Sequence, residues 1–488
     1  IACGNMAQTS QAEIANSLLD DPRVTAIGLH IEGFGDTFEW ATLARKAHAK
    51  GIPLIALKVG KSDQAQRATV SHTASLAGSD SGASALLRHL GIGRVYDLPT
   101  FLETLMLLHS AGPLDAKTLS SVSCSGGEAS LVADLAHDTE MDFPVLTDAQ
   151  RTQLSRALGP MVALSNPLDY NTYIWRDTDA MTRAWLPMAA SHIGLTLLIV
   201  DYPHTDASDW VCATDAAIAV RKQSGRPVAV VATSPELMPL DIAQKLLASG
   251  VTPLNGLREA IAAAQIAASG KPPALETPLV AGADRTAILL SESAAKAELS
   301  TFGMRVPKQA KDFASGTALT ETFAVKGTGF AHKSEAGAVA LNVTHLELAE
   351  VVKNMPGDGV LIEEMITGAV AKMLLGVVRD PAHGFVLTVG AGGILTEIMK
   401  DTVSFIVPTS ADDIRALLPS LKSYPLLTGF RGKSAANIDD LINAIMALQS
   451  YVVAHADRIE EVEINPIMCT PTAAIAADAL IRIAPERT

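Results

Sequence analysis

The chain has 488 residues, of which 48% are apolar and 18% are charged, so it can form about three domains at roughly 150 residues each. Its net charge of −14 argues against a nucleic-acid partner, because binding phosphates requires clustered lysines and arginines. We see no signal peptide, no apolar run of membrane length and no CxxC pair among the four cysteines. These features favour a cytoplasmic protein with free thiols and no membrane partner.

The first block of the chain has the pattern of a βαβ unit. Short apolar runs at 26–31 and 53–59 flank a helical segment at 41–51, which ends at a glycine. This order and spacing predict parallel strands joined by a helix. The chain starts at Ile1 in what reads as the end of a strand and a Gly-Asn turn. We therefore expect a further N-terminal region outside this chain.

A polar loop containing His72 follows the second strand. It reads RATVSHTASLAGSD at 67–80, and its hydroxyls and Gly-Ser amides would suit a phosphoryl group. Glu32 ends the first strand, and sites in doubly wound sheets form at the carboxyl ends of the strands. A carboxylate there can hold one imidazole nitrogen and leave the other as a nucleophile. The alternative is an ordinary hydrogen-bonded loop histidine.

The longer run GKSDQAQRATVSHTASLAGSD at 60–80 closely resembles the phosphohistidine segment of ADP-forming acetyl-CoA synthetases. It resembles the matching segment of succinyl-CoA synthetase more distantly. The resemblance implies that His72 is transiently phosphorylated and that Glu32, in a matching LxxEG turn, stabilises it.

The second block repeats the strand and helix rhythm, with strands at 119–124, 195–201 and 227–232 and a helix from about Glu128. The turn SCSGGEAS contains Ser125, Gly126 and Gly127. It is either a packing turn or a helix N-terminus that offers amides to an anion, and it is similar to the family's second ligase domain. The aromatic run at 170–175 either belongs to the core or shapes an acyl pocket.

The third block follows a linker that is rich in proline, GKPPALETP at 270–278. Its apolar segments at 322–326, 359–365, 373–378 and 385–389 are closely spaced. This spacing predicts antiparallel strands in an α+β domain rather than another doubly wound sheet.

This block resembles the ATP-grasp domain of the same family. Lys326 closes the run FAVK, where the matching lysine binds nucleotide phosphates; without the resemblance it would be a solvated lysine. FAHKSEAGAV at 330–339 resembles the family's second histidine loop, HKxDxGG, in which His332 matches a phosphate-carrying histidine. Glu335 and Ala338 depart from the pattern, and alanine restricts the backbone more than glycine does.

Further positions are assigned by the same resemblance. GVLIEEM at 359–365 matches the adenine-binding hinge strand, in which Glu363 or Glu364 would be the acid that contacts the nucleotide. Arg379 in VVRDP and Glu397 in VGAGGILTEIMKD match family motifs. Ala371 and Lys372 stand where the family commonly has an acid after a Gly-Gly pair, so this chain departs from the family pattern there.

The sequence also predicts a magnesium site. EVEINP at 461–466 places Glu463 and Asn465 two residues apart on a strand, so both side chains point to one face. Asp478 follows at the end of the next expected strand. Converging carboxylate and amide oxygens suit Mg²⁺, and the pattern ExNP followed by a late Asp resembles the ATP-grasp metal site.

These resemblances together imply an α/β protein. Two doubly wound, flavodoxin-like CoA-ligase domains (1–110 and 111–270) would be joined by a linker (271–284) to an α+β ATP-grasp domain (285–488). The family's N-terminal CoA-binding domain does not lie in this chain. The implied activity is an ADP-forming acid–thiol ligase that uses ATP, Mg²⁺ and coenzyme A on a small carboxylic acid. We expect a homo-oligomer or association with a CoA-binding domain.

Several alternatives stay open from the sequence. The chain could be an ATP-grasp carboxylate–amine ligase without a phosphohistidine, although the SHTASLAGSD loop argues against it. It could be a non-catalytic CoA or nucleotide sensor, which both histidines, Glu463 and Asn465 argue against. It could also be a synthetase coupled to a lyase step on the CoA ester. The sequence does not identify the acid.

Overall fold

The computed structural model describes residues 1–4, 6, 8–62, 64, 79–274, 276–280, 282, 286–310, 320–330, 336–393 and 399–486. The chain forms two compact units, one made of residues 1–75 and 90–273, the other of residues 76–89 and 274–488. Within the described residues no helix has the length and apolar character needed to cross a membrane.

The first unit begins with a small parallel sheet of order β1-β2-β3. Its elements are α1 (Gln11–Leu18), β1 (Ile27–Ile31), α2 (Thr37–Ala49), β2 (Leu54–Lys58), β3 (Gly93–Val95) and α5 (Leu98–Ser110). The predicted βαβ unit is confirmed. Its helix starts earlier than expected, because the Asp36 carboxylate accepts a hydrogen bond from the Phe38 N–H and caps α2.

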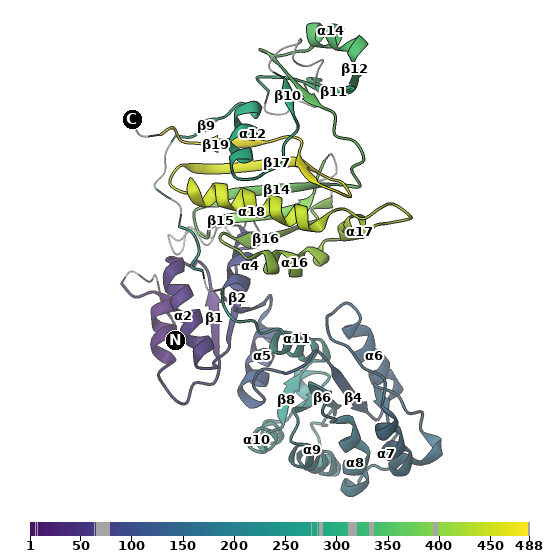
Figure 1. Ribbon diagram of the computed structural model, residues 1–488. Helices are drawn as coiled ribbons and strands as arrows, with labels where there is room; N and C mark the ends of the chain where they lie inside the picture. Colours follow the sequence, from purple (N-terminus) through teal and green to yellow (C-terminus); the bar gives the residue numbers. More distant parts are fainter. Residues whose placement is uncertain are drawn as a thin grey trace. The chain divides into compact units, whose positions relative to one another are not determined.

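A five-stranded parallel sheet of order β5-β4-β6-β7-β8 follows in the same unit. Its strands are β4 (Leu119–Ser123), β5 (Leu168–Asp169), β6 (Leu195–Ile199), β7 (Val228–Ala232) and β8 (Thr252–Asn255). Its helices are α6 (Gly126–Ala136), α7 (Asp148–Leu158), α8 (Thr178–Trp185), α9 (Val211–Ser224), α10 (Leu240–Ala248) and α11 (Leu257–Ala268). Strands β4, β6 and β7 are buried along their whole length, as expected for a sheet with helices on both faces (Figure 1).

Alternate residues of these strands enter two different cores. Leu197 and Ile199 of β6 face a core shared with α5, α6 and α11, whereas Leu198 faces the core formed with α7, α8 and α9. The first of these cores also takes in Ile55 and Val95 from the small sheet. The two predicted ligase domains therefore share one hydrophobic core.

The second unit contains two antiparallel sheets, of orders β10-β13-β11-β12 and β16-β15-β14-β17-β19-β9, with β18 paired to β17. This confirms the predicted α+β character. The strands are β9 (Ile288–Leu289), β10 (Gln309–Ala310), β11 (Thr322–Gly327), β12 (Val339–Thr344), β13 (Val360–Glu364), β14 (Ala371–Asp380), β15 (Gly384–Ala391), β16 (Thr402–Ile406), β17 (Ile459–Cys469), β18 (Ala474–Ala476) and β19 (Leu480–Ile483).

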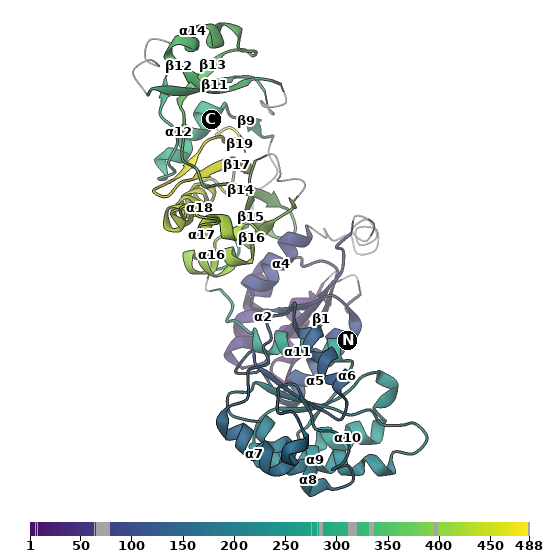
Figure 2. The ribbon, with the colours of Figure 1, turned by 90° about the vertical axis from the view of Figure 1, so that its right-hand side faces the viewer.

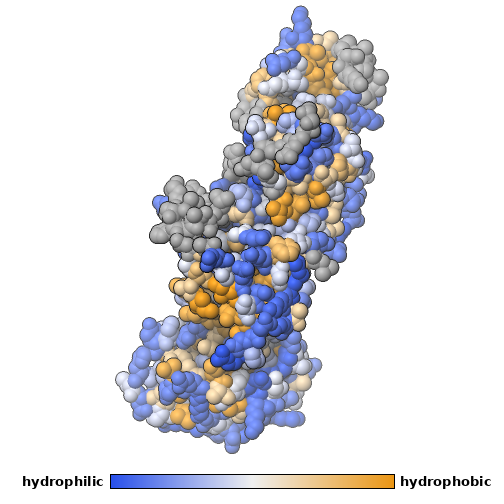
Figure 3. All heavy atoms as spheres, turned by 90° about the vertical axis from the view of Figure 1, so that its left-hand side faces the viewer, coloured by the Kyte–Doolittle hydropathy of each residue, from blue (hydrophilic) through white to orange (hydrophobic). Residues whose placement is uncertain are grey.

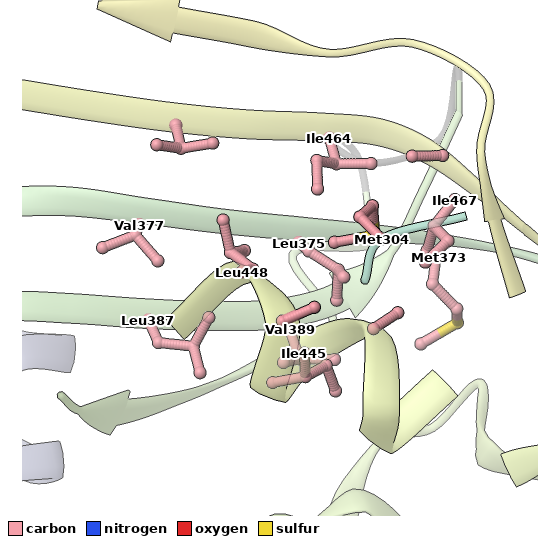
Figure 4. Packing of buried hydrophobic residues seen from close by; sticks show 14 of the residues in the cluster. Met304, Met373, Leu375, Val377, Leu387, Val389, Ile445, Leu448, Ile464 and Ile467 are labelled. Atoms are coloured by element: carbon pink, nitrogen blue, oxygen red, sulfur yellow. The ribbon is translucent and has the colours of Figure 1, made fainter. Parts of the chain in front are cut away.

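Helices pack on these sheets. They are α4 (Asp80–His89), α12 (Glu292–Thr301), α14 (His345–Asn354), α16 (Ala411–Leu417), α17 (Tyr424–Thr428) and α18 (Ile438–Ala454). Helix α18 covers one face of the larger sheet (Figures 1 and 2). Figure 4 shows Ile445 and Leu448 of α18 against Leu375, Leu387 and Val389 of β14 and β15, and all five are fully buried. Burial of each such side chain stabilises the fold by about 1.5–3 kcal/mol.

Helix α4 packs against β16 of this second unit, although the sequence analysis assigned residues 80–89 to the first ligase domain. The Arg88 guanidinium donates a hydrogen bond of 3.0 Å to the carbonyl of Ser404. The Ala274 N–H donates to the carbonyl of His89 at 2.8 Å, where the chain re-enters the unit. Helix α4 thus belongs to the second unit, although in the sequence it comes well before the other residues of that unit.

The molecular surface mixes polar and apolar residues. Figure 3 shows hydrophilic residues over much of one face, with smaller hydrophobic groups among them. Exposed apolar side chains of the first unit include Tyr96, Leu98 and Leu102. Scattered exposed apolar groups are usual for folded proteins.

Candidate functional site

A cluster of four buried, charged side chains lies where α12, β11 and β13 meet in the second unit. The Lys326 Nζ lies 2.7 Å from Glu292 Oε1 and 2.9 Å from Glu363 Oε2. The Lys296 Nζ lies 2.7 Å from the same Glu292 oxygen and 2.6 Å from Glu363 Oε1. Both ammonium groups also donate to the carbonyl of Ala477. All four side chains are less than a tenth exposed, and their formal charges sum to zero.

The local sequence explains how the cluster forms. Glu292 and Lys296 are four residues apart on α12, so they share one face of the helix. Lys326 and Glu363 lie on the adjacent strands β11 and β13, which pair Lys326 with Leu361 and Ala324 with Glu363. A side chain from each strand therefore meets the charged face of the helix.

The electrostatics of this cluster keep Lys326 charged. Burial disfavours the ammonium, but the carboxylates of Glu292 and Glu363 and the charge of Asp478 outweigh it and raise the pKa of Lys326. Burial and then the neighbouring Lys326 lower the pKa of Lys296. The two carboxylates thus hold Lys326 in place and favour its charged form.

The structure distinguishes the two adjacent acids of the hinge strand. Glu363 is 1% exposed and faces both lysines, and it also accepts a 3.0 Å hydrogen bond from the Gln309 Nε2. Glu364 points to the other side of β13, where its carboxylate accepts from the backbone N–H of Lys308 at 3.1 Å. Successive side chains of a strand alternate between faces, so only Glu363 belongs to the charged cluster.

The predicted magnesium ligands lie on β17 and just after β18. Glu463 and Asn465 share a face of β17, with Asn465 Nδ2 3.4 Å from Glu463 Oε1. The Asn465 Oδ1 accepts a 2.9 Å hydrogen bond from the Gly393 N–H. The Ala477 N–H donates to the carbonyl of Pro466, which brings Asp478 beside this part of β17.

The side-chain oxygens of these three residues are ligands of the type that a hard cation prefers. Glu463 and Asp478 contribute carboxylate oxygens and Asn465 an amide oxygen, the ligand types that Mg²⁺ prefers. No group of three or more His, Cys, Asp or Glu side chains is arranged to hold a metal within the described part of the chain. The metal assignment therefore rests on two carboxylates and an amide, and Mg²⁺ usually keeps waters and substrate oxygens as its other ligands.

Three predicted residues, His72, His332 and Glu397, lie outside the described residues. The Arg379 guanidinium donates to the carbonyl of Gly282. The substitution at Ala338 is accommodated, because the positive φ of this turn falls on Gly337 (64°) and the Ala338 side chain is fully buried.

In the first unit, Glu32 directly follows β1 at the carboxyl edge of the small sheet and is half-buried. The register pairs Ile31 with Lys58, the last residue of β2, whose side chain is only 5% exposed. The structure thus places a buried lysine at the same strand edge as Glu32. The sequence analysis missed Lys58, although a lysine at the end of the apolar run PLIALKV was a signal.

The Gly-rich turn of the second ligase region caps α6, which runs from Gly126 to Ala136 with Ser125 as its N-cap. Three acids gather at this carboxyl edge of the five-stranded sheet. Burial, followed by the charges of Asp201 and Asp169, raises the pKa of Glu128 to about 6. A packing turn or an anion site was predicted here, and the neighbouring acids were not predicted.

The aromatic run at 170–175 mostly enters the core. Tyr170 is 2% exposed and packs edge-to-face on Trp185, with ring centroids 5.7 Å apart. Trp175 packs on Trp210 in the same way. Tyr173 is exposed. The core interpretation therefore holds for Tyr170.

Comparisons with known proteins agree with this architecture. The sequence model of the ATP-grasp domain matches residues 285–483, and that of the succinyl-CoA ligase like flavodoxin domain matches residues 1–108. The ADP-forming acetate–CoA ligase of Methanocaldococcus jannaschii is 25% identical, over 96% of this chain and 71% of that protein. A trans-feruloyl-CoA synthase from a prokaryotic organism is 25% identical, over 99% of this chain and 72% of that protein.

A third relative matches a smaller part of the chain. The beta subunit of ADP-forming acetate–CoA ligase I from Pyrococcus furiosus is 30% identical, over 39% of this chain and 90% of that subunit. The two family models and these three relatives show that the chain belongs to the ADP-forming acyl-CoA synthetase family.

Proposed function

We propose that this chain carries the chemistry of an ADP-forming acid–thiol ligase, which makes an acyl-CoA from a carboxylic acid, coenzyme A and ATP. The observation that carries the proposal is the buried cluster around Lys326 in the domain matched by the ATP-grasp family. The two carboxylates hold the Lys326 ammonium in place, and we propose that nucleotide phosphates replace part of this pairing and bind the preorganised cation.

The proposed reaction has three steps. A ring nitrogen of His72 takes the γ-phosphoryl group of ATP, and ADP leaves. The phosphoryl group then passes from His72 to the carboxylate, which forms an acyl phosphate. The thiol of coenzyme A attacks the acyl carbon, loses its proton, and releases inorganic phosphate as the thioester forms. In an alternative form of the first step, His332 takes the γ-phosphoryl group from ATP and passes it to His72.

The residues of the second unit have separate roles in this proposal. Lys326 binds nucleotide phosphates, and Glu363 holds Lys326 rather than contacting the base. Glu463, Asn465 and Asp478 would hold Mg²⁺, which supplies charge neutralisation at the phosphates when bound. Arg379 and Glu397 keep nucleotide-binding roles only through their motif matches.

In the first unit we propose that Glu32 orients the His72 imidazole, and that Ser125, Gly126 and Gly127 present backbone N–H groups to the phosphoryl group. We also propose that the enzyme works in the cytoplasm, as a homo-oligomer or with a CoA-binding domain. Relatives named for acetate and for trans-ferulate leave the acid open, so a panel of acids is required.

The test is incorporation of phosphate from [γ-³²P]ATP with Mg²⁺. The wild-type chain should take up acid-labile, base-stable label, and the tryptic peptide that contains His72 should carry it. The His72→Ala variant should leave that peptide unlabelled. Label that persists in full in both His72→Ala and His332→Ala would refute a phosphohistidine mechanism, and label at His332 alone in His72→Ala would show that His332 reacts first.

A further inference from the structure

Within the second unit, both ends of helix α4 are hydrogen-bonded to the larger sheet or its turns. The backbone N–H and the hydroxyl of Ser79 both donate to Asp380 Oδ2, at 3.0 and 2.9 Å. The Ser79 Oγ also accepts a 3.1 Å hydrogen bond from the Gly82 N–H. Ser79 therefore caps α4 and at the same time attaches the helix to the end of β14.

The other oxygen of Asp380 holds the turn between β14 and β15. Asp380 Oδ1 accepts from the N–H groups of Ala382 and His383, at 2.9 and 3.2 Å, and lies 3.1 Å from the His383 Nδ1. Asp380 is 8% exposed and His383 is fully buried. One carboxylate thus joins a rigid turn of the nucleotide-binding domain to the start of α4.

Two further observations show that this junction is closely fitted. A Cβ on Gly82 would lie 2.7 Å from the His383 Nδ1 and 3.2 Å from Asp380 Oδ2, so only glycine lets α4 approach so near. Burial would raise the pKa of Asp380, but His383 and the N–H groups of Ser79 and Ala382 outweigh burial, and the pKa is lowered. The surroundings of Asp380 therefore favour its ionised form.

We propose that Asp380, held by His383, and Ser79 are positioning residues for phosphoryl transfer from ATP to His72. They fix the chain directly after the phosphohistidine segment to the nucleotide-binding domain. This inference rests on the proposed function. Ser79 follows His72 by seven residues, and seven residues span at most about 25 Å. Fixing Ser79 to the Asp380 turn therefore bounds the distance along the chain between that turn and His72, and holding a reacting group in place is a recognised source of rate.

The test compares phosphorylation rates in the full chain. Single-turnover labelling from [γ-³²P]ATP and Mg²⁺ is measured for Asp380→Asn, Ser79→Ala and Ser79→Thr, together with ADP affinity and Tm. We expect Asp380→Asn and Ser79→Ala to be slower by about 10- to 100-fold, the loss typical of a misplaced reacting group, with ADP affinity within twofold of wild type. The threonine variant keeps the hydroxyl and should react within about threefold of wild type.

Two control variants separate positioning from stability. Ser410→Ala removes the N-cap of α16 in the same unit, where Ser410 Oγ accepts from the Asp413 N–H at 3.1 Å. Asp440→Asn alters a carboxylate that accepts from the Ala474 N–H at 2.8 Å. Both should lower Tm as much as the test variants do, yet label at the wild-type rate.

The labelling rates distinguish failure of the positioning role from failure of the proposed function. Wild-type labelling rates in Asp380→Asn and Ser79→Ala would overturn the positioning role and leave the proposed function intact, as would equally slow labelling in the two controls. A wild-type chain that takes no label at His72 would instead overturn the proposed function, and the positioning role with it.

Discussion

The two units each hold a cluster of charged side chains, and the two clusters are built in opposite ways. In the second unit, two lysines and two glutamates balance one another in the cluster around Lys326. In the first unit, Glu128 lies near Asp169 and Asp201. Asp201 accepts hydrogen bonds from Thr233 and Asp169 accepts one from the Asn171 N–H. We therefore expect the balanced cluster to lose stability when a charge is removed and the acidic group to gain stability.

Removing Lys326 should have the largest effect. The Lys326→Met variant leaves Glu292 and Glu363 with one cation instead of two in a buried site. Loss of one partner of a buried ion pair lowers the free energy of unfolding by about 3–5 kcal/mol. Denaturant unfolding measures this loss, and phosphoenzyme formation should fall on the order of 100-fold or more.

The matched control is Lys308→Met, which removes an exposed lysine beside β10. It should change stability by less than about 0.5 kcal/mol and leave labelling unchanged. If Lys326→Met unfolds and labels like this control, the cluster is neither structural nor functional.

Glu363 and Glu364 are adjacent on β13, so they allow an acid inside the charged cluster to be compared with an acid outside it. Glu363→Gln removes a buried charge that contacts two lysines and should destabilise the second unit by about 3 kcal/mol or more. Glu364→Gln keeps an oxygen that can accept from the Lys308 N–H and should cost about 1 kcal/mol or less. Urea unfolding of both variants checks the order, and equal losses would contradict the assignment of Glu363 to the cluster.

Asp478 tests the metal site at the edge of the same cluster. The Asp478→Asn variant should need on the order of 10- to 100-fold more Mg²⁺ for phosphoenzyme formation, because one oxygen ligand loses its charge. Its melting temperature without Mg²⁺ should stay close to that of wild type. An unchanged Mg²⁺ titration would reject Asp478 as a ligand, and a large fall in melting temperature would indicate a structural role.

The sequence predicted the architecture well because periodicity reports local structure. The βαβ unit, the parallel strands of the second block and the antiparallel third block all follow from the spacing of apolar runs. The common core of the two ligase regions was not predictable in this way. It depends on Ile55 and Val95 meeting residues more than a hundred positions later, and a single sequence carries no signal of such pairing.

The sequence named candidate site residues only where a motif marked them. Lys326 was named as a candidate, but its ion-pair partners Glu292 and Lys296 were not, because an Ala-rich helix with an acid and a lysine four residues apart is ordinary on a surface. Their burial depends on β11 and β13 covering that face. The placement of α4 was missed for the same reason, since the partner of Ser79 lies 301 residues away in Asp380.

The smallest predicted effect tests the acidic group of the first unit. Burial and the charges of Asp201 and Asp169 raise the pKa of Glu128 from 4.5 to about 6, so the folded state disfavours its ionised form. Below pH 4.5 the carboxyl is neutral in both states and costs nothing. As the pH rises through about 6, the folded protein must hold the charge and loses stability relative to the unfolded chain. Glu128→Gln should therefore raise Tm by roughly 1–3 °C at pH 8 and leave it unchanged at pH 4.

The control is Asp241→Asn, which changes an exposed acid of the same unit. It should give no gain in Tm at pH 8, because the charge of Asp241 is favourable at the N-terminus of α10. A gain for Glu128→Gln that is equal at both pH values would show that better packing, rather than relief of charge repulsion, is its source.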